Sequence, residues 1–269
     1  MIPPVTIYKN LLPESARQDL VNWFFEEDHY TDKRPDCVSK NPDWNLDDWP
    51  QQALKVTLDN VHDHPYEVEH INFFYNLTSR FGVHVDSGYG QNEQNLYQII
   101  IMPLTVEGDI GTVFFKNYWA NRCAKFTKKP FNRFSYNLRD INGELVHIQD
   151  LRELQQQYDQ GQNVPFSRDV LDSLSDLINA REQLHGYHPR NLVINDYTSL
   201  QGYTGQPFNQ DVYNRYLQHV DYEDLEGLEF DCYVPWVPGD VVVFPREQLH
   251  AASSGVLPKL GISIFTNRI

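Results

Sequence analysis

A histidine and an aspartate that lie two residues apart are the side chains best suited to chemistry in this chain. His84-Val85-Asp86 follows an aromatic and β-branched run at residues 71–77, which predicts a strand, and a break at residues 78–82. Because side chains alternate between the faces of a strand, His84 and Asp86 are expected to point the same way. An imidazole and a carboxylate in one cavity supply two ligands of the two-histidine, one-carboxylate site, which leaves three positions of Fe(II) open.

The third ligand is expected from a distant strand that lies beside the first. Residues 240–244 form a largely apolar run after a glycine turn, Pro245 ends the run, and His250 begins the next segment. An isolated histidine is usually a hydrogen-bonded structural residue, and this shared context distinguishes His84 and His250 from one. We therefore predict that His84, Asp86 and His250 form a metal site and its catalytic centre.

Two further histidine groups are weaker candidates. His219-Val220-Asp221 repeats the His-x-Asp spacing but follows a helical pattern, in which residues two apart do not share a face. We interpret it as a surface sequence. The group His62-Asp63-His64, close to His70, has the residue types of a separate divalent-cation site, whereas Pro65 and the acidic surroundings favour a solvated loop.

Taken in chain order, these motifs resemble those of the Fe(II)/2-oxoglutarate-dependent dioxygenases, and those of the prolyl-hydroxylase-like branch most closely. The shared order is His-x-Asp, a Gly-Thr-Val-Phe-Phe strand at residues 111–115, a Gly-Asp-Val-Val-Val-Phe-Pro strand at residues 239–245, and the distal His250. The resemblance covers residues 68–116 and 228–268. It implies a mainly β fold with flanking helices (α+β), whose core is a double-stranded β-helix, the jelly roll that cupins also use.

The stretch between the matching parts, residues 117–227, has no counterpart in that family. Its patterns predict two strands around a turn and two helices, at residues 134–138 and 144–148 and at residues 169–184 and 209–220. We expect a single oxygenase domain over residues 1–269, with 117–227 as a partly helical insertion. A second lobe and a lid over the site are both compatible with this pattern.

The resemblance also implies how the cosubstrate, 2-oxoglutarate, is held. Relatives bind its far (C5) carboxylate with a basic residue on the strand after the distal histidine, which corresponds to Lys259 here; Arg268 is a competing candidate. Relatives also place an aromatic hydroxyl near the cosubstrate, and the resemblance assigns this role to Tyr75 or, on the neighbouring strand, to Tyr97. The structural alternatives are a solvated edge-strand lysine and half-buried strand tyrosines.

The activity implied by the resemblance is that of a hydroxylase. Family members convert 2-oxoglutarate and dioxygen to succinate and CO2, and they oxidise a C–H bond of a small molecule or a peptide side chain. Asp86 favours hydroxylation, desaturation or demethylation over halogenation, because related halogenases carry a small residue at that position. Nothing in the sequence identifies the substrate or the oligomeric state.

Two other functions fit parts of the same pattern. A cupin-like metalloenzyme would use the triad with Fe, Mn or Zn and without 2-oxoglutarate, and it would give Lys259 no role. A non-enzymatic jelly-roll module would instead bind a ligand along its aromatic side chains, Trp44, Trp49, Trp119 and Trp236.

Two elements ahead of the motifs are expected to support them. Residues 13–25 predict a helix that carries Ala16, Leu20 and Phe24 on one face. Residues 54–61 predict either a short helix or a strand.

The site itself requires a set of short strands. Residues 96–104 and 111–115 are expected to form an antiparallel pair across the turn at Gly108. Regular strands are expected again near the end of the sequence, at residues 228–234, 240–244 and 260–266.

The overall composition describes an ordinary globular protein. The chain has 269 residues, of which 41% are apolar and 13% aromatic, and its net charge of −15 makes nucleic acid an unexpected partner. Cys37, Cys123 and Cys232 are widely spaced and odd in number, which fits reduced thiols. The sequence shows neither a signal-peptide pattern nor an apolar run of membrane-spanning length, so we expect a soluble, cytoplasmic protein without a membrane partner.

Overall fold

The computed structural model of the protein contains two compact units. The structure describes residues 5–26, 32–33, 37–42, 44, 50–76, 81–86, 96–118, 125–127, 136–139, 145–148, 151–162, 164, 167–172, 191–193, 201–255 and 258–269. One unit comprises Met1–Phe126 together with Asn195–Ile269, and the other comprises Thr127–Ile194. Every residue predicted to belong to the functional site lies in the first unit.

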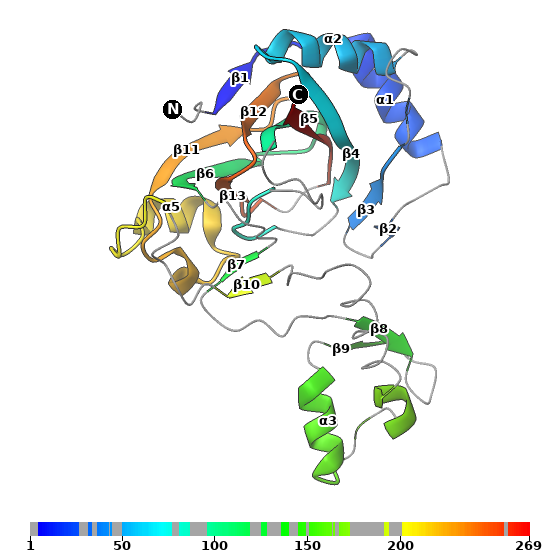
Figure 1. The fold of residues 1–269 in the computed structure, drawn as a ribbon, viewed down its shortest axis with the longest axis vertical. Coiled ribbons are helices and arrows are strands. Elements are labelled where there is room, and N and C mark those ends of the chain that lie inside the picture. The colour runs from blue at the N-terminus through cyan, green and yellow to red at the C-terminus, as the bar shows by residue number, and fades with distance from the viewer. Residues whose placement is uncertain are drawn as a thin grey trace. The chain divides into compact units, whose positions relative to one another are not determined.

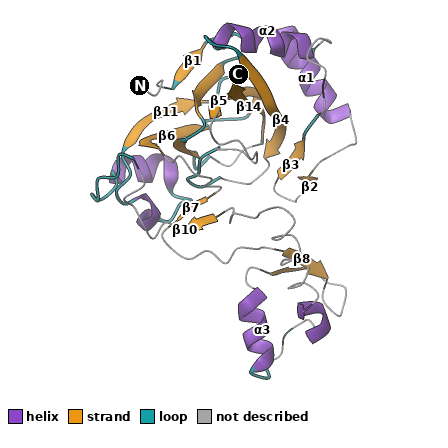
Figure 2. Ribbon diagram, in the orientation of Figure 1, coloured by secondary structure: helices purple, strands orange, loops and turns teal. Residues whose placement is uncertain are grey.

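The first unit is built around two antiparallel sheets (Figures 1 and 2). The larger sheet has the order β1 (Thr6–Tyr8), β12 (Val241–Pro245), β5 (Leu96–Val106), β14 (Lys259–Arg268), β4 (Tyr66–Asn76), β3 (Cys37–Lys40) and β2 (Asp32–Lys33). The smaller sheet has the order β11 (Phe230–Pro235), β6 (Gly111–Tyr118) and β13 (Gln248–Ala252). An isolated bridge between His84 and His250 adds residues 81–86, the His84 segment, beside β13.

The chain passes back and forth between these sheets. In chain order, β4 belongs to the larger sheet, the His84 segment to the smaller, β5 to the larger, β6 and β11 to the smaller, β12 to the larger, β13 to the smaller and β14 to the larger. Side chains from both sheets, including Ile99, Phe114 and Phe244, form a shared buried cluster, so the sheets pack face to face. This alternation is a double-stranded β-helix, and the predicted jelly-roll core is confirmed.

One predicted strand pairing is wrong. Strands β5 and β6 were expected to form an antiparallel pair, but β5 pairs with β12 and β14, whereas β6 pairs with β11 and β13. Gly108, with a φ of 107°, lies in the turn that carries the chain from the larger sheet to the smaller one. Two apolar strands joined by a short turn can form a hairpin within one sheet, or they can belong to two different sheets. The local sequence pattern is the same in both cases.

Two helices cover the outer face of the larger sheet (Figure 1). Helix α1 (Glu14–Glu26) buries Ala16, Leu20 and Phe24, as predicted, and α2 (Gln51–Val61) shows that residues 54–61 belong to a helix. Both helices pack on the outward side chains of β4, β5, β12 and β14, such as Phe73 and Ile262. The outer face is therefore an apolar helix-on-sheet core.

The inner face of the larger sheet has a different character. Along β14, Leu260, Ile262 and Ile264 pack on the helices, which turns the alternate side chains, beginning with Lys259, toward the smaller sheet. Gly261 lies on this inner face, where an added Cβ would come within 3.0 Å of ring atoms of Phe74 and Trp236. A side chain at this position would have to displace one of these rings, so the close packing favours glycine.

The remaining elements partly match the predicted insertion. In the second unit, β8 (Tyr136–Arg139) pairs with β9 (Leu145–Ile148), as expected for the predicted hairpin, and α3 (Leu151–Asp159) follows. The second unit is shorter than residues 117–227, and a role as a lid stays a prediction. Other short elements are the strands β7 (Lys125–Thr127) and β10 (Asn191–Val193), the helix α5 (Gln210–Val212), a π-helical turn at Tyr213–Leu217 and a 3-10 helix at Tyr222–Leu225.

Several sequence-based expectations fall outside the described residues. These include most of the helix predicted at 169–184, Cys123, Trp49 and Trp119. The part of the chain that the structure does describe contains no helix long and apolar enough to cross a membrane.

Candidate metal centre

Three side chains from distant parts of the sequence meet inside the first unit. The ligand atoms of His84, Asp86 and His250 all lie within 4.8 Å of one another. Nε2 of His250 is 3.1 Å from Oδ2 of Asp86, and Nε2 of His84 is 3.8 Å from Oδ1 of Asp86. Among the described residues, this is the one group of histidine, cysteine and acidic side chains with such a spacing.

Backbone hydrogen bonds set the positions of the three residues. His84 and His250 exchange two N–H to carbonyl bonds of 3.0 Å each, so they are directly opposite partners on adjacent segments. Their imidazole rings consequently lie side by side, with centroids 4.2 Å apart. The backbone N–H of Asp86 donates to the carbonyl of Arg246 at 3.0 Å, which fixes the carboxylate beside the two rings.

Each imidazole is oriented by a second hydrogen bond. Nδ1 of His84 donates to the carbonyl of Gly82 at 2.8 Å, and Nδ1 of His250 donates to the carbonyl of Gln248 at 3.0 Å. Because a carbonyl only accepts, each ring carries a hydrogen on Nδ1, which leaves Nε2 as the ring nitrogen available to a metal ion. Both Nε2 atoms face the Asp86 carboxylate. This donor set fits a divalent transition-metal ion, and its outer hydrogen bonds fix the tautomers that such a site needs.

The electrostatics favour the same protonation states. Burial lowers the pKa of His84 to about 4, with the neighbouring His250 and Lys259 acting in the same direction. Burial by itself would raise the pKa of Asp86, but interactions with His250, His84 and Arg246 outweigh it and leave that pKa below its ordinary value. Near neutral pH the site therefore holds a neutral His84 imidazole and an ionised Asp86 carboxylate, as a cation would require.

Arg246 is a functional residue to which the sequence analysis gave no role. Its fully buried side chain donates from Nε to the carbonyl of Asp86 at 3.0 Å, and from Nη1 to Glu69 at 2.6 Å and Asn267 at 2.9 Å. The backbone N–H of Asp86 in turn donates to the backbone carbonyl of Arg246. Arg246 therefore bonds both the N–H and the carbonyl of Asp86 and fixes its backbone. An arginine between an all-apolar strand and the distal histidine was the one available signal.

Lys259 lies in the interior of the jelly roll, on the inner face of β14. Only 6% of its surface is exposed, and Nζ lies 4.4 Å from the ring centroid of Trp236. The Trp236 ring is itself held by a 2.9 Å hydrogen bond from Nε1 to Thr112. The alternative of a solvated edge-strand lysine is therefore wrong, because the ammonium is buried in the same interior as the His-Asp-His group.

The structure does not bring the two predicted tyrosines to the triad. Tyr75 lies on the outer face of β4, where its ring packs against Phe24 and Phe25 of α1 at 6.2 and 5.4 Å. The Tyr97 hydroxyl donates to Asp63, and the Arg268 guanidinium lies 4.6 Å from the Tyr97 ring centroid. Their role at a cosubstrate stays a prediction without a described contact to the triad.

Arg268 is also separated from Lys259. The two residues are at opposite ends of the ten-residue strand β14, and at the usual rise along a strand this places them about 30 Å apart. Arg268 is exposed, whereas Lys259 is buried.

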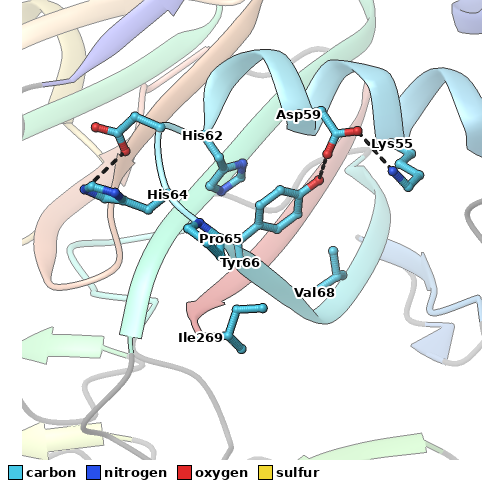
Figure 3. A pocket seen from close by; sticks show the side chains of 9 residues that line it. Lys55, Asp59, His62, His64, Pro65, Tyr66, Val68 and Ile269 are labelled. Carbon is cyan, nitrogen blue, oxygen red and sulfur yellow. Dashed lines mark hydrogen bonds and ion pairs between the residues drawn. The ribbon is translucent and has the colours of Figure 1, made fainter.

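The second histidine group lines an open surface pocket beside the end of α2 (Figure 3). Its polar groups are engaged: His62 bonds the Leu58 carbonyl through Nδ1 and the Thr266 hydroxyl through Nε2, and Asp59 bonds Tyr66 and Lys55. His62 also stacks on Tyr66, with ring centroids 4.0 Å apart. These contacts explain the residues as local packing, and they do not form a metal-ligand group.

The other His-x-Asp sequence is also structural. His219 is half-buried rather than fully at the surface, and its ring contacts the Ser254 hydroxyl at 3.2 Å and the Phe81 carbonyl at 3.3 Å.

Comparisons with known proteins give structural likeness only. No protein-family model and no curated protein matches the sequence. Similar solved structures include HygX from Streptomyces hygroscopicus with nickel and 2-oxoglutarate bound (9% identity, 98% of this chain and 82% of that chain covered, TM-score 0.43). Another is the viral collagen prolyl hydroxylase from Paramecium Bursaria Chlorella virus-1 in its 2-oxoglutarate complex (6%, 98% and 96%, TM-score 0.41).

A third similar structure is the epimerase SnoN in complex with Fe3+, alpha-ketoglutarate and nogalamycin RO (9% identity, 98% of this chain and 78% of that chain covered, TM-score 0.45). The structures that this fold resembles thus include members of the superfamily that the motifs resemble. At such low identities and TM-scores these structures are no evidence for what this chain binds. The evidence for its function is the geometry of His84, Asp86 and His250.

The depressed pKa of His84 makes stability depend on pH. An unfolded histidine titrates near 6.5, whereas folded His84 titrates at about 4, so the folded state binds fewer protons and its stability falls as pH drops below 6.5. With a chelator present, this single group should cost about 2 kcal/mol of unfolding free energy between pH 7 and pH 5. Urea unfolding at both values measures the effect. The variant His84→Gln should show a correspondingly smaller pH dependence, and an equal one would contradict the assignment.

Removing the Arg246 side chain should loosen the site as well as the fold. Arg246→Met leaves Glu69 and Asn267 without their buried partner, and we expect a loss of about 3 kcal/mol in unfolding free energy. Because the Asp86 carbonyl also loses its donor, Co(II) affinity should fall roughly tenfold. Calorimetric titration and urea unfolding measure the two effects. Arg215→Met, at an exposed arginine, should change neither.

Proposed function

We propose that this protein is an Fe(II)- and 2-oxoglutarate-dependent dioxygenase that hydroxylates a small molecule or a peptide side chain. The observation that carries the proposal is the convergence of two Nε2 atoms and one carboxylate within 4.8 Å inside a jelly roll. Nε2 of His84, Nε2 of His250 and the carboxylate of Asp86 would hold the iron on one face. That ligand set leaves the opposite positions open for a cosubstrate and dioxygen.

The position of Lys259 supports 2-oxoglutarate as the cosubstrate. Its ammonium lies in the jelly-roll interior, 4.4 Å from the ring centroid of Trp236, where a carboxylate would meet a positive charge. Lys259 also contributes to the lowered pKa of His84, so its charge acts on the metal centre. Its ammonium would pair with the far carboxylate of 2-oxoglutarate while the other end of the molecule faces the metal.

The chain's own residues then have separate tasks. When bound, Fe(II) together with 2-oxoglutarate and dioxygen supplies the oxidation of a substrate C–H bond, with succinate and CO2 as products. His84, Asp86 and His250 hold the metal in a fixed orientation through hydrogen bonds that exist before any ligand enters. The apolar cluster shared by the two sheets keeps bulk water from the interior. The carboxylate of Asp86 occupies a position that a halide would need, which favours hydroxylation.

A metalloenzyme that does not use 2-oxoglutarate is the second candidate function. It would rely on the same triad, and the open ligand positions alone do not distinguish the two. The position of the Lys259 ammonium inside the jelly roll is the feature that favours the dioxygenase, because the far carboxylate of 2-oxoglutarate would bind a cation there. A non-enzymatic jelly-roll module that binds a ligand along its aromatic side chains is disfavoured by the convergence of the two Nε2 atoms on the Asp86 carboxylate.

Loss of a metal ligand should abolish both metal binding and turnover. We expect Asp86→Ala and His250→Ala to reduce Fe(II) affinity and succinate formation from 2-oxoglutarate by more than ~100-fold, because each removes a direct ligand. Metal analysis of the purified protein and a coupled succinate assay measure these quantities. His64→Ala, at an exposed histidine in the α2 pocket, serves as the control and should retain both. Full turnover in either ligand variant would refute the proposal.

Removal of the interior cation should affect the cosubstrate specifically. We expect Lys259→Met to raise the apparent Km for 2-oxoglutarate by roughly 10- to 100-fold, since a charge-assisted hydrogen bond is lost, while Fe(II) affinity stays close to that of the wild type. Arg268→Met, at the exposed end of the same strand, should leave the Km unchanged. The reverse pattern would transfer the carboxylate contact to Arg268. An unchanged Km in both variants would favour the enzyme without 2-oxoglutarate.

A further inference from the structure

A buried amide beside Lys259 has no hydrogen-bond partner. The side chain of Asn76, the last residue of β4, is 2% exposed, and both its Nδ2 and its Oδ1 are buried without a partner. Among the described residues, Asn76 is the one whose side-chain nitrogen and oxygen are both in this condition. Buried polar groups are nearly always paired, so a fully unpaired amide points to a partner outside the chain, either a water molecule or a ligand.

The position of Asn76 identifies where that partner lies. Asn76 is the direct cross-strand partner of Lys259 in the β4–β14 ladder. Tyr75, the preceding residue, packs on the outer helices, and Phe74 belongs to the inner cluster, so alternation turns Asn76 inward. Opposed side chains on one face of an antiparallel pair start from Cβ atoms about 5 Å apart. The amide of Asn76 and the ammonium of Lys259 therefore address the same small volume of the interior.

We propose that Asn76 is a second 2-oxoglutarate-binding residue, which completes with Lys259 a paired site for the far carboxylate. This inference rests on the proposed function. Nδ2 of Asn76 donates to one carboxylate oxygen, and the Lys259 ammonium, with three N–H donors, bonds the other and the Oδ1 atom of Asn76. The arrangement gives both the Nδ2 and the Oδ1 atom of Asn76 a hydrogen-bond partner.

The proposal gives Asn76 the task that an aromatic hydroxyl was expected to perform. The resemblance in the sequence favoured Tyr75, but that side chain lies on the opposite face of the strand. One residue further along, the inward position carries the side-chain amide of Asn76, which is also a hydrogen-bond donor. The amide also explains how a lysine, which acts as a point charge, can be given directional selectivity for a planar carboxylate.

Anaerobic titration of the Fe(II) protein tests the proposal without turnover. The charge-transfer absorption band that forms when a 2-oxo acid chelates iron reports the affinity for 2-oxoglutarate and for 2-oxobutyrate, which lacks the far carboxylate. Asn76→Leu, similar in shape but without hydrogen-bonding groups, should weaken 2-oxoglutarate binding about tenfold or more and leave 2-oxobutyrate binding unchanged. Asn76→Asp should weaken 2-oxoglutarate binding further, because like charges would then face each other. It also serves if the leucine variant does not fold.

A matched control removes another buried amide. Gln98 on β5 is also buried and has an unpaired Oε1, but β5 does not place it opposite Lys259. Gln98→Met should therefore leave both affinities at the wild-type values. Without ligand, Asn76→Leu should melt at the same temperature as the wild type or higher, because it removes an unpaired buried group, whereas a structural role would lower the melting temperature.

The possible failures are distinguishable. If the wild-type Fe(II) protein does not bind 2-oxoglutarate, both the proposed function and the role of Asn76 are refuted. If the wild type binds it and the Asn76 variants bind it equally well, only the role of Asn76 is refuted. Equal weakening toward 2-oxoglutarate and 2-oxobutyrate would also overturn the carboxylate contact, since it would reflect a general disturbance of the site.

Discussion

The pair of backbone hydrogen bonds between His84 and His250 is the constraint on which the site depends. It joins segments that are far apart in the sequence. Because the two residues are directly opposite each other, their side chains lie on the same face of the paired segments. A slip of one residue in this pairing would turn one imidazole away from the other and from Asp86. The register of the smaller sheet therefore determines whether the side chains of His84, Asp86 and His250 converge.

The fold accommodates an unusual amount of charge around this point. Asp86, Arg246 and Lys259 all lie in or beside the jelly-roll interior, although burying a charge is unfavourable unless hydrogen bonds or an opposite charge accompany it. Arg246 is matched by Glu69, Asn267 and the Asp86 carbonyl. Apolar residues of similar volume at these positions would often give an equal or higher free energy of unfolding. The helix-covered outer face, which is almost entirely apolar, supplies the burial that allows the interior to remain polar.

The sequence predicted the triad and most strands, because these depend on local pattern and order along the chain. It did not predict the partners of β5 and β6, since strand pairing depends on contacts between distant segments that a local pattern does not contain. The face on which Tyr75 lies was missed because its role was taken from the family resemblance and not from the alternation along β4. Side chains alternate with a period of two, so a shift of one residue exchanges the inward and outward positions. Arg246 could be seen but not interpreted without its buried partners.

The contrast between the two faces of the larger sheet connects these observations. On the helix side, Phe73, Leu260 and Ile262 complete one another's packing, so that face is finished within the chain itself. On the inner side, Asn76 and Lys259 stand opposite each other at the end of the same two strands, and the amide is left without a bond. The inner face therefore differs from the outer one in holding a buried amide that no group in the described part of the chain pairs with. A ligand with a carboxylate at one end and a metal-chelating group at the other would meet both the amide–lysine pair and the triad, and it would satisfy the interior that the chain leaves incomplete.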